Sequence, residues 1–97
     1  FLHHVHHGQN LQEAVDAPTF STTHFPASFY PKRASLRSLM VEGRFSELVV
    51  SALRSRGHDV SVGDPWSQGR MCVVAQDHDL LKASASARNT QSYAAGR

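Results

Sequence analysis

One stretch of the chain, residues 46–57, carries apolar side chains at helical spacing and predicts an amphipathic helix. Ser46 stands at the N-cap position, and Phe45 and Val50 have the spacing of a hydrophobic staple. Gly57 is a typical residue for the end of a helix. The residues expected on the face that packs against the rest of the molecule are Leu48, Val49, Ala52 and Leu53.

Residues 1–18 predict two short helical segments separated by a glycine. Residues 2–7 followed by Gly8 have the pattern of the last turns of a helix with a glycine stop. Asn10 then precedes Glu13 by three positions, which is the spacing of a capping box. Pro18 disfavours helical geometry in the residue before it, so the second helix is expected to span Leu11 to Asp16.

The remaining apolar segments have the lengths and the alternation of β-strands. A short strand is expected at residues 39–41, and the alternation of residues 58–62 predicts a half-buried strand. An apolar run at residues 71–75, a polar tip at residues 76–79 and a returning segment at residues 80–85 predict a hairpin. This order of elements predicts an α+β fold in which a helix packs against a mainly antiparallel sheet.

Two segments are expected to be irregular. Residues 19–31 interleave aromatic residues with prolines, which predicts a loop whose aromatic side chains anchor it on a core. Residues 86–97 form a polar C-terminal tail. Residues 1–97 as a whole are expected to be a single partial domain.

Composition and charge narrow the possible partners. The chain has 97 residues, of which 40% are apolar, so it is one small domain at most or a piece of a larger one. Ten Lys and Arg against eight Asp and Glu give a formal net charge of +2, and the basic residues are dispersed rather than gathered in a stripe. No apolar run approaches the roughly 20 residues of a membrane span. We therefore expect no nucleic-acid partner and no membrane partner.

The cysteine count and the N-terminus suggest how the chain arises. Cys72 is the only cysteine, which excludes an internal disulfide. The chain starts at Phe1 without a Met or a recognisable signal peptide, as expected of a fragment or a processed product. The compartment stays open between cytoplasm and periplasm.

Five stretches, in order along the chain, resemble segments of γ-glutamyltransferases and their bacterial relatives. They are residues 10–18 (NLQEAVDAP), 24–32 (HFPASFYPK), 53–60 (LRSRGHDV), 66–70 (WSQGR) and 87–97 (ARNTQSYAAGR). One such match is a weak signal, whereas five in the expected order are a strong one. By this resemblance the chain is similar to the C-terminal portion of the small subunit of that family.

The resemblance implies a parent enzyme that cleaves its own precursor and attacks a γ-glutamyl amide such as glutathione with a new N-terminal threonine. It implies that this threonine precedes the matched segment, so the chain alone is expected to be inactive. The chain would supply outer strands and a helix to the αββα sandwich of an N-terminal-nucleophile hydrolase, with the remainder of the enzyme as its partner. We assign it no catalytic, cofactor-binding or metal-binding residue. The alternative is a stand-alone, self-associating interaction module.

A triplet at Thr22, Thr23 and His24 is the most tempting catalytic candidate, because the family's nucleophile also opens with Thr-Thr-His. Its context differs, since Asp16-Ala17-Pro18 precedes it and Pro26 follows it. The structural interpretation is a loop whose hydroxyls bond the backbone.

Several histidines and Cys72 also call for interpretation. His3, His4, His6 and His7 include pairs that share a helix face and could hold a metal, but no neighbouring Cys, Asp or Glu completes a four-ligand set. Cys72 lies in an apolar strand without a cationic neighbour, so we expect a protonated thiol in a core.

His78 lies between Asp77 and Asp79, where a solvated turn is the simpler interpretation than an acid/base pair. His58 is expected to cap a helix or to satisfy a strand edge. Arg88 is the most distinctive match of the C-terminal stretch. It is expected to order the tail through fork-like bonds to carbonyls or a carboxylate, a role we favour over substrate binding.

Overall fold

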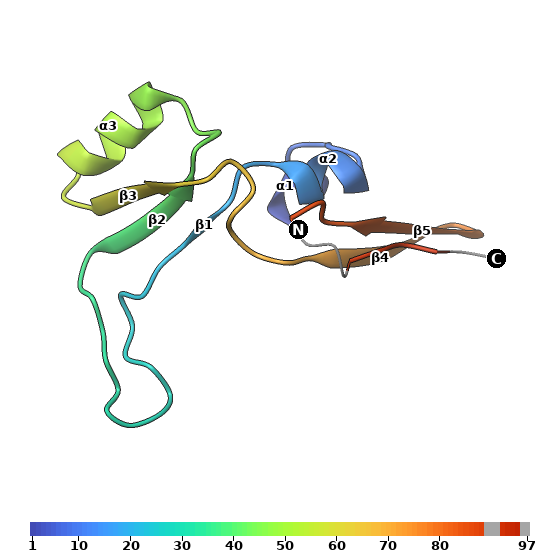
Figure 1. Cartoon of the computed structure of the whole chain (residues 1–97). Coiled ribbons are helices and arrows are strands. Elements are labelled where there is room, and N and C mark those ends of the chain that lie inside the picture. The colour runs from blue at the N-terminus through green and yellow to red at the C-terminus, as the bar shows by residue number, and fades with distance from the viewer. Residues whose placement is uncertain (89–91, 96–97) are drawn as a thin grey trace. The chain divides into compact units, whose positions relative to one another are not determined.

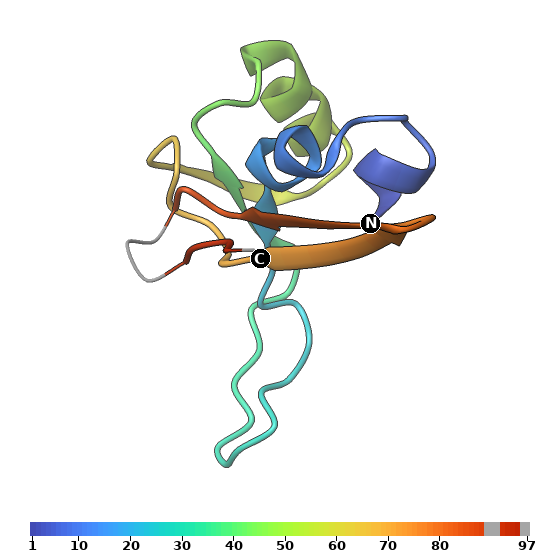
Figure 2. The ribbon, with the colours of Figure 1, turned by 90° about the vertical axis from the view of Figure 1, so that its right-hand side faces the viewer.

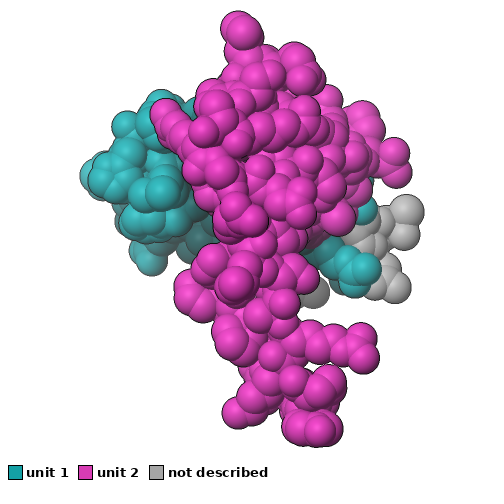
Figure 3. Space-filling model, turned by 90° about the vertical axis from the view of Figure 1, so that its left-hand side faces the viewer, with its two compact units in different colours: residues 1–17, 70–97 teal, residues 18–69 magenta. Residues whose placement is uncertain are grey.

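The computed structural model describes residues 1–88 and 92–95, and the chain forms two compact units. Unit 1 consists of residues 1–17 and 70–97, and unit 2 consists of residues 18–69, as coloured in Figure 3. Whether the two act as one partial domain stays a prediction. Each unit is described here by itself.

Unit 2 is a three-stranded sheet with one covering helix. Its elements are β1 (Phe20–Ser21), β2 (Ser38–Glu42), α3 (Glu47–Ser55) and β3 (Asp59–Gly63). The strand order is β1-β2-β3; β1 pairs with β2 antiparallel, whereas β2 pairs with β3 in parallel. The parallel pairing follows from the crossover, because α3 carries the chain from the end of β2 back to the start of β3 across one face of the sheet (Figure 1).

The core of unit 2 lies between α3 and the sheet. It is formed by Val41, Val50 and Val60, with Leu39, Phe45 and Leu53 packed against it. The expected buried face of the helix is wrong for Leu48, which is 84% exposed, and for Val49 and Ala52, which are also exposed. The helix carries apolar residues on more than one side. The side that carries Val50 and Leu53 is the one that faces the sheet.

Both ends of α3 agree with the local sequence signals. Ser46 is the N-cap residue, although its side chain makes no capping hydrogen bond. At the other end Gly57 has φ +91°, a backbone conformation that favours glycine. The backbone amides of Gly57 and His58 donate to the carbonyls of Arg54 (2.9 Å) and Leu53 (3.2 Å), so the last carbonyls of the helix are satisfied.

Unit 1 is a β-hairpin with two short helices. Its elements are α1 (Leu2–Val5), α2 (Leu11–Asp16), β4 (Cys72–Asp77) and β5 (Leu80–Ala85). β4 and β5 are antiparallel, and α2 contacts both strands (Figures 1 and 2). The capping box is confirmed, because Glu13 N donates to Asn10 Oδ1 and Asn10 N donates to Glu13 Oε2, both at 2.9 Å.

The packing of unit 1 is thin. Leu11 and Val15 of α2 are its buried apolar residues among those described. Polar contacts join α2 to β5, since the buried Ser84 hydroxyl donates to Gln12 Oε1 (3.0 Å) and Gln12 Nε2 donates to Ala85 O (3.1 Å). The described parts of the tail, residues 86–88 and 92–95, contain no helix or strand.

The α+β class predicted from the sequence is therefore confirmed, and two of the three strand pairings are antiparallel. The parallel pairing of β2 with β3 was not predicted. The hairpin turn is also shorter than expected, because Gln76 and Asp77 belong to β4 and the turn consists of His78 and Asp79. His78 has φ +52°, as a residue of a tight turn can have.

Candidate functional site

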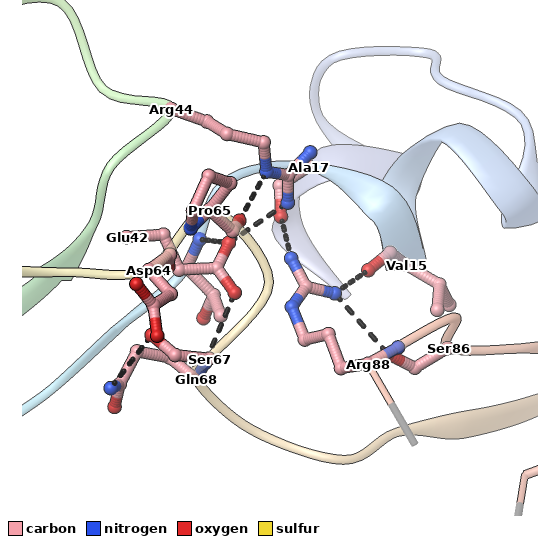
Figure 4. Close-up of polar contacts among 11 residues, drawn as sticks. Val15, Ala17, Glu42, Arg44, Asp64, Pro65, Ser67, Gln68, Ser86 and Arg88 are labelled. Carbon is pink, nitrogen blue, oxygen red and sulfur yellow. Dashed lines mark hydrogen bonds and ion pairs between the residues drawn. The ribbon is translucent and has the colours of Figure 1, made fainter. Parts of the chain in front are cut away.

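Arg88 anchors the tail of unit 1 to the end of α2. Its guanidinium donates from Nη1 to Val15 O and from Nη2 to Ala17 O, both at 2.7 Å (Figure 4). Nη1 also contacts the hydroxyl of the buried Ser86 at 3.3 Å. A cation at the C-terminal carbonyls of a helix is favoured by the helix dipole, and two parallel bonds fix its orientation. The pair of hydrogen bonds from the Arg88 guanidinium to backbone carbonyls, expected from the sequence, is thus present.

Glu42 is the most buried charged group described in unit 2, with 0% of its surface exposed. Its Oε2 accepts from Thr19 N at 3.2 Å. Oε2 also accepts from Arg44 Nη2 (2.8 Å), and Oε1 accepts from Gln68 N (3.1 Å), as Figure 4 shows. A buried carboxylate is tolerated where hydrogen bonds and a counter-charge satisfy it. Glu42 therefore ties the end of β2 to segments before β1 and after β3.

Arg44 extends this network to the segment after β3. Its Nε donates to Pro65 O at 2.7 Å, and its guanidinium lies 3.6 Å from the centre of the Trp66 ring. A guanidinium over an aromatic face is stabilised by the ring quadrupole. The backbone there is tight, because a Cβ on Gly43 would lie 2.9 Å from Gly63 O. The predicted motif at residues 66–70 thus borders a structural network that the sequence analysis missed.

The Thr-Thr-His triplet forms the base of a loop. Thr22 Oγ1 donates to Ser38 O (2.5 Å) and accepts from His24 N (3.2 Å), and Thr23 Oγ1 bonds Ser38 Oγ (3.3 Å). His24 Nδ1 accepts from Arg37 N at 2.9 Å. Thr22 and His24 bond backbone groups across the loop, as the structural interpretation predicted, whereas Thr23 bonds the hydroxyl of Ser38. Neither threonine has a free amine, because both lie within the chain.

The N-terminal histidines do not converge on a metal geometry. His3 and His7 have ring centroids 5.8 Å apart, and His4 Nδ1 lies 2.7 Å from Gln9 O. Within residues 1–88 and 92–95, no three His, Cys, Asp or Glu side chains are grouped as metal ligands would be. Nor does that part of the chain contain a helix with the length and apolarity to span a bilayer.

Cys72 is exposed, which corrects the expectation of a core thiol. It lines an open apolar groove of about 570 Å³ bounded by α1, α2 and β4. The strand was expected to be buried because its run is apolar, but α2 leaves most of β4 exposed, and Val74 is 72% exposed. The groove is lined mostly by apolar side chains.

Asp77 and Lys82, beside the hairpin turn, form an ion pair at the surface. The hydrogen bond from Lys82 Nζ at 2.5 Å, together with its positive charge, lowers the pKa of Asp77 below its ordinary value. His78 is 95% exposed and lies 3.9 Å from Asp77 Oδ1, a loose contact typical of a solvated turn. His58 serves the helix end through its backbone amide, as the capping interpretation predicted.

A scan against protein-family models matches residues 1–96 to the family "Gamma-glutamyltranspeptidase". The chain belongs to the γ-glutamyltranspeptidase family. The resemblance of the five ordered sequence stretches is thereby confirmed. The comparison with curated proteins found no match.

Solved structures place the chain as a portion of larger proteins. The structure of LmbA2991T421A is 47% identical, with a TM-score of 0.85 over 91% of this chain and 16% of that chain. LmbA2991HD is 46% identical, with a TM-score of 0.84 over 96% of this chain and 16% of that one. The γ-glutamyltranspeptidase from Pseudomonas nitroreducens complexed with L-DON is 13% identical, with a TM-score of 0.69 over 99% of this chain and 46% of that chain, which shows the shared fold.

Proposed function

We propose that the chain is a non-catalytic structural segment, the C-terminal portion of the small subunit of a γ-glutamyltranspeptidase-like enzyme. The parent would transfer a γ-glutamyl group from glutathione or a related amide to water or an amino acid. Its N-terminal threonine nucleophile would lie in a part of the enzyme outside these residues. The observation that carries the proposal is the family match over residues 1–96 in a chain that spans 16% of its more similar solved relatives.

The chemistry of the described residues supports a structural role. The charged groups with the most contacts, Glu42 and Arg88, bond backbone groups and hold segments of their own unit together. Thr22 and Thr23 are engaged in the loop. The apolar groove of unit 1, lined by residues of α1, α2 and β4, is the kind of surface that a larger fold would cover.

The experiment measures hydrolysis of a γ-glutamyl anilide by three preparations: this chain, the remainder of the parent enzyme, and the two produced together. We expect turnover from the combined preparation alone, since the nucleophile and the C-terminal segment must both be present. Thr22→Ala and Thr23→Ala in this chain should leave the combined activity within about twofold of the unsubstituted value. Release of glutamate from glutathione by the purified chain alone would overturn the proposal.

The alternative, a stand-alone self-associating module, is favoured by one observation. Val74, Leu80 and Leu81 of the hairpin are 72%, 65% and 78% exposed, and a two-stranded sheet has open edges that can pair with another copy. Sedimentation of the purified chain over a range of concentrations tests this. Dimers or larger species that disperse when the rest of the parent is added would fit the enzyme segment, whereas dimers that persist would fit the module.

A further inference from the structure

The loop between β1 and β2, residues 22–37, exposes an aromatic tip that the structural role leaves unused. Phe25, Phe29 and Tyr30 are 78%, 86% and 94% exposed. They were expected to anchor the loop on a core, and the structure corrects this, because the loop projects from the sheet of unit 2 (Figure 1). Three large aromatic side chains exposed to this degree in one loop indicate an interaction surface.

The loop is held in one shape by bonds across it. Ala27 N donates to Arg33 O (3.0 Å), and Ser35 N donates to Thr23 O (2.8 Å). At the tip, Lys32 N donates to Phe29 O at 2.7 Å. Much of the conformational entropy that a loop would lose on docking is therefore already lost in the free chain. This favours binding by a preformed surface.

Positive charge accompanies the aromatic residues. No Asp or Glu occurs between residues 17 and 41, whereas Lys32, Arg33 and Arg37 all lie in the loop and are exposed. They are three of the ten basic residues, which leaves seven basic against all eight acidic residues elsewhere. The loop thus carries the positive excess of the whole chain. A second copy of this chain would offer it a surface close to charge balance.

We propose that this loop is a docking surface for an acidic polypeptide that presents apolar side chains among its carboxylates. The three aromatic side chains contact those apolar groups and the three cations meet the carboxylates around them, an arrangement of apolar centre and polar rim that is common in protein interfaces. An anionic membrane is a poorer fit, because polybasic membrane-binding segments carry roughly four to eight basic residues. A duplex presents no apolar side chains to the aromatic tip.

The test uses the full chain and fluorescently labelled probes, with binding followed by anisotropy at low salt. The probes are a random copolymer of Glu and Tyr, poly-Glu, vesicles of phosphatidylserine and phosphatidylcholine, and a DNA duplex. We expect the Glu–Tyr copolymer to bind about tenfold more tightly than poly-Glu, because it supplies apolar groups along with carboxylates. Its affinity should fall as salt is raised, since the charge attraction is screened.

Two loop variants and one matched control separate charge from apolar contact. Lys32→Glu with Arg33→Glu should weaken binding of the copolymer at least about tenfold. Phe29→Ser with Tyr30→Ser should reduce copolymer affinity to the poly-Glu level. The control, Arg56→Glu with Arg70→Glu, makes the same change in net charge at exposed positions outside the loop and should keep the copolymer affinity within about twofold.

Circular dichroism of each variant verifies that the fold is retained. Failure of the unsubstituted chain to bind the copolymer, or equal losses in the loop and control variants, would overturn the proposal. Tighter binding of the vesicles or of the duplex than of the copolymer would also overturn it and would assign the loop to a lipid or nucleic-acid surface.

Discussion

Unit 2 has a core and a satisfied buried charge, whereas unit 1 has little of either. In unit 2 a helix covers a three-stranded sheet, and Val41 and Val50 are 1% and 2% exposed. In unit 1 the sheet has two strands, and most side chains of β4 and β5 are exposed. Isolated two-stranded sheets are marginal in water, and the hairpin of unit 1 is supported by a single short helix, α2, instead of a third strand. Unit 2 therefore contains most of the contacts that stabilise it. Unit 1 depends more on contacts with further parts of a protein to bury its apolar side chains.

Removing the carboxylate of Glu42 should have the largest effect, and it tests most directly whether the buried charge stabilises unit 2. Glu42→Ala leaves Thr19 N, Gln68 N and Arg44 without their acceptor, so we expect the free energy of unfolding of unit 2 to fall by about 3 kcal/mol. Urea unfolding followed by fluorescence of Trp66, the one Trp of the chain, measures it.

Two further variants make the Glu42 result interpretable. Glu42→Gln keeps one acceptor oxygen and should lose about half as much. Glu47→Gln removes an exposed partner of Arg54 at 3.6 Å and should change the free energy by less than about 0.5 kcal/mol. If Glu42→Ala resembled Glu47→Gln, the buried network would not stabilise unit 2.

A pair of substitutions on α3 tests which face of the helix holds unit 2 together. Val50→Ala opens space in the core and should cost about 2 kcal/mol, whereas Leu48→Ala at an 84% exposed position should cost less than about 0.5 kcal/mol. The same Trp66 fluorescence transition reports both. Equal losses would mean that Leu48 is covered in solution, for instance by another copy or by the rest of the enzyme.

The fork of Arg88 is the corresponding test for unit 1. Arg88→Lys keeps the charge but cannot bond Val15 O and Ala17 O in parallel, so we expect α2 to lose about 1 kcal/mol of local stability. Hydrogen exchange of the α2 amides measures this loss. Arg56→Lys, at an exposed position in unit 2, serves as the control and should leave those amides unchanged. Unchanged exchange in Arg88→Lys would indicate that charge alone suffices.

The smallest effect concerns the hairpin turn. In Lys82→Met the carboxyl of Asp77 loses the hydrogen bond and the positive charge, so its pKa should rise toward its ordinary value. Because that pKa is lowered in the folded chain, the contribution of the pair is present above the ordinary value and is lost as the pH falls through the lowered one. An NMR titration of the Asp77 carboxyl, with Asp79→Asn used for assignment, follows the shift. An unmoved pKa would contradict the role of Lys82.

Local signals account for the parts of the structure that the sequence predicted. The Asn10–Glu13 capping box, the glycine end of α3 and strands β2 to β5 depend on neighbouring residues and were predicted to within about two residues. The short strand β1, Phe20–Ser21, was missed, because it lies in a segment that was expected to be irregular. The carbonyls that receive Arg88 were anticipated in kind, but their identity as Val15 and Ala17, more than seventy positions away, was not. Contacts of that range leave no periodic trace in a single sequence.

The errors share a physical cause as well. Glu42 has the position of a polar residue at the end of a strand. Arg44 is near it in sequence, but its backbone partners Thr19 and Gln68 lie 23 and 26 positions away, so nothing local marks Glu42 as buried. Cys72 and Leu48 occur in apolar runs. Such a run indicates that its side chains could be buried, but it does not show whether another part of the fold lies over them. Their exposure here is what a segment of a larger fold would show before its neighbours are added.

The order in which the two units can form follows from how they share the chain. Unit 2 is one uninterrupted stretch of the sequence, residues 18–69. It lies between the two stretches that make up unit 1, residues 1–17 and 70–97. During synthesis, unit 2 is complete on the ribosome while α2 still lacks the strands it will pack against. Joining the two distant pieces of unit 1 closes a long loop, and a folded insert that brings its own ends together would lower the entropy lost in that closure.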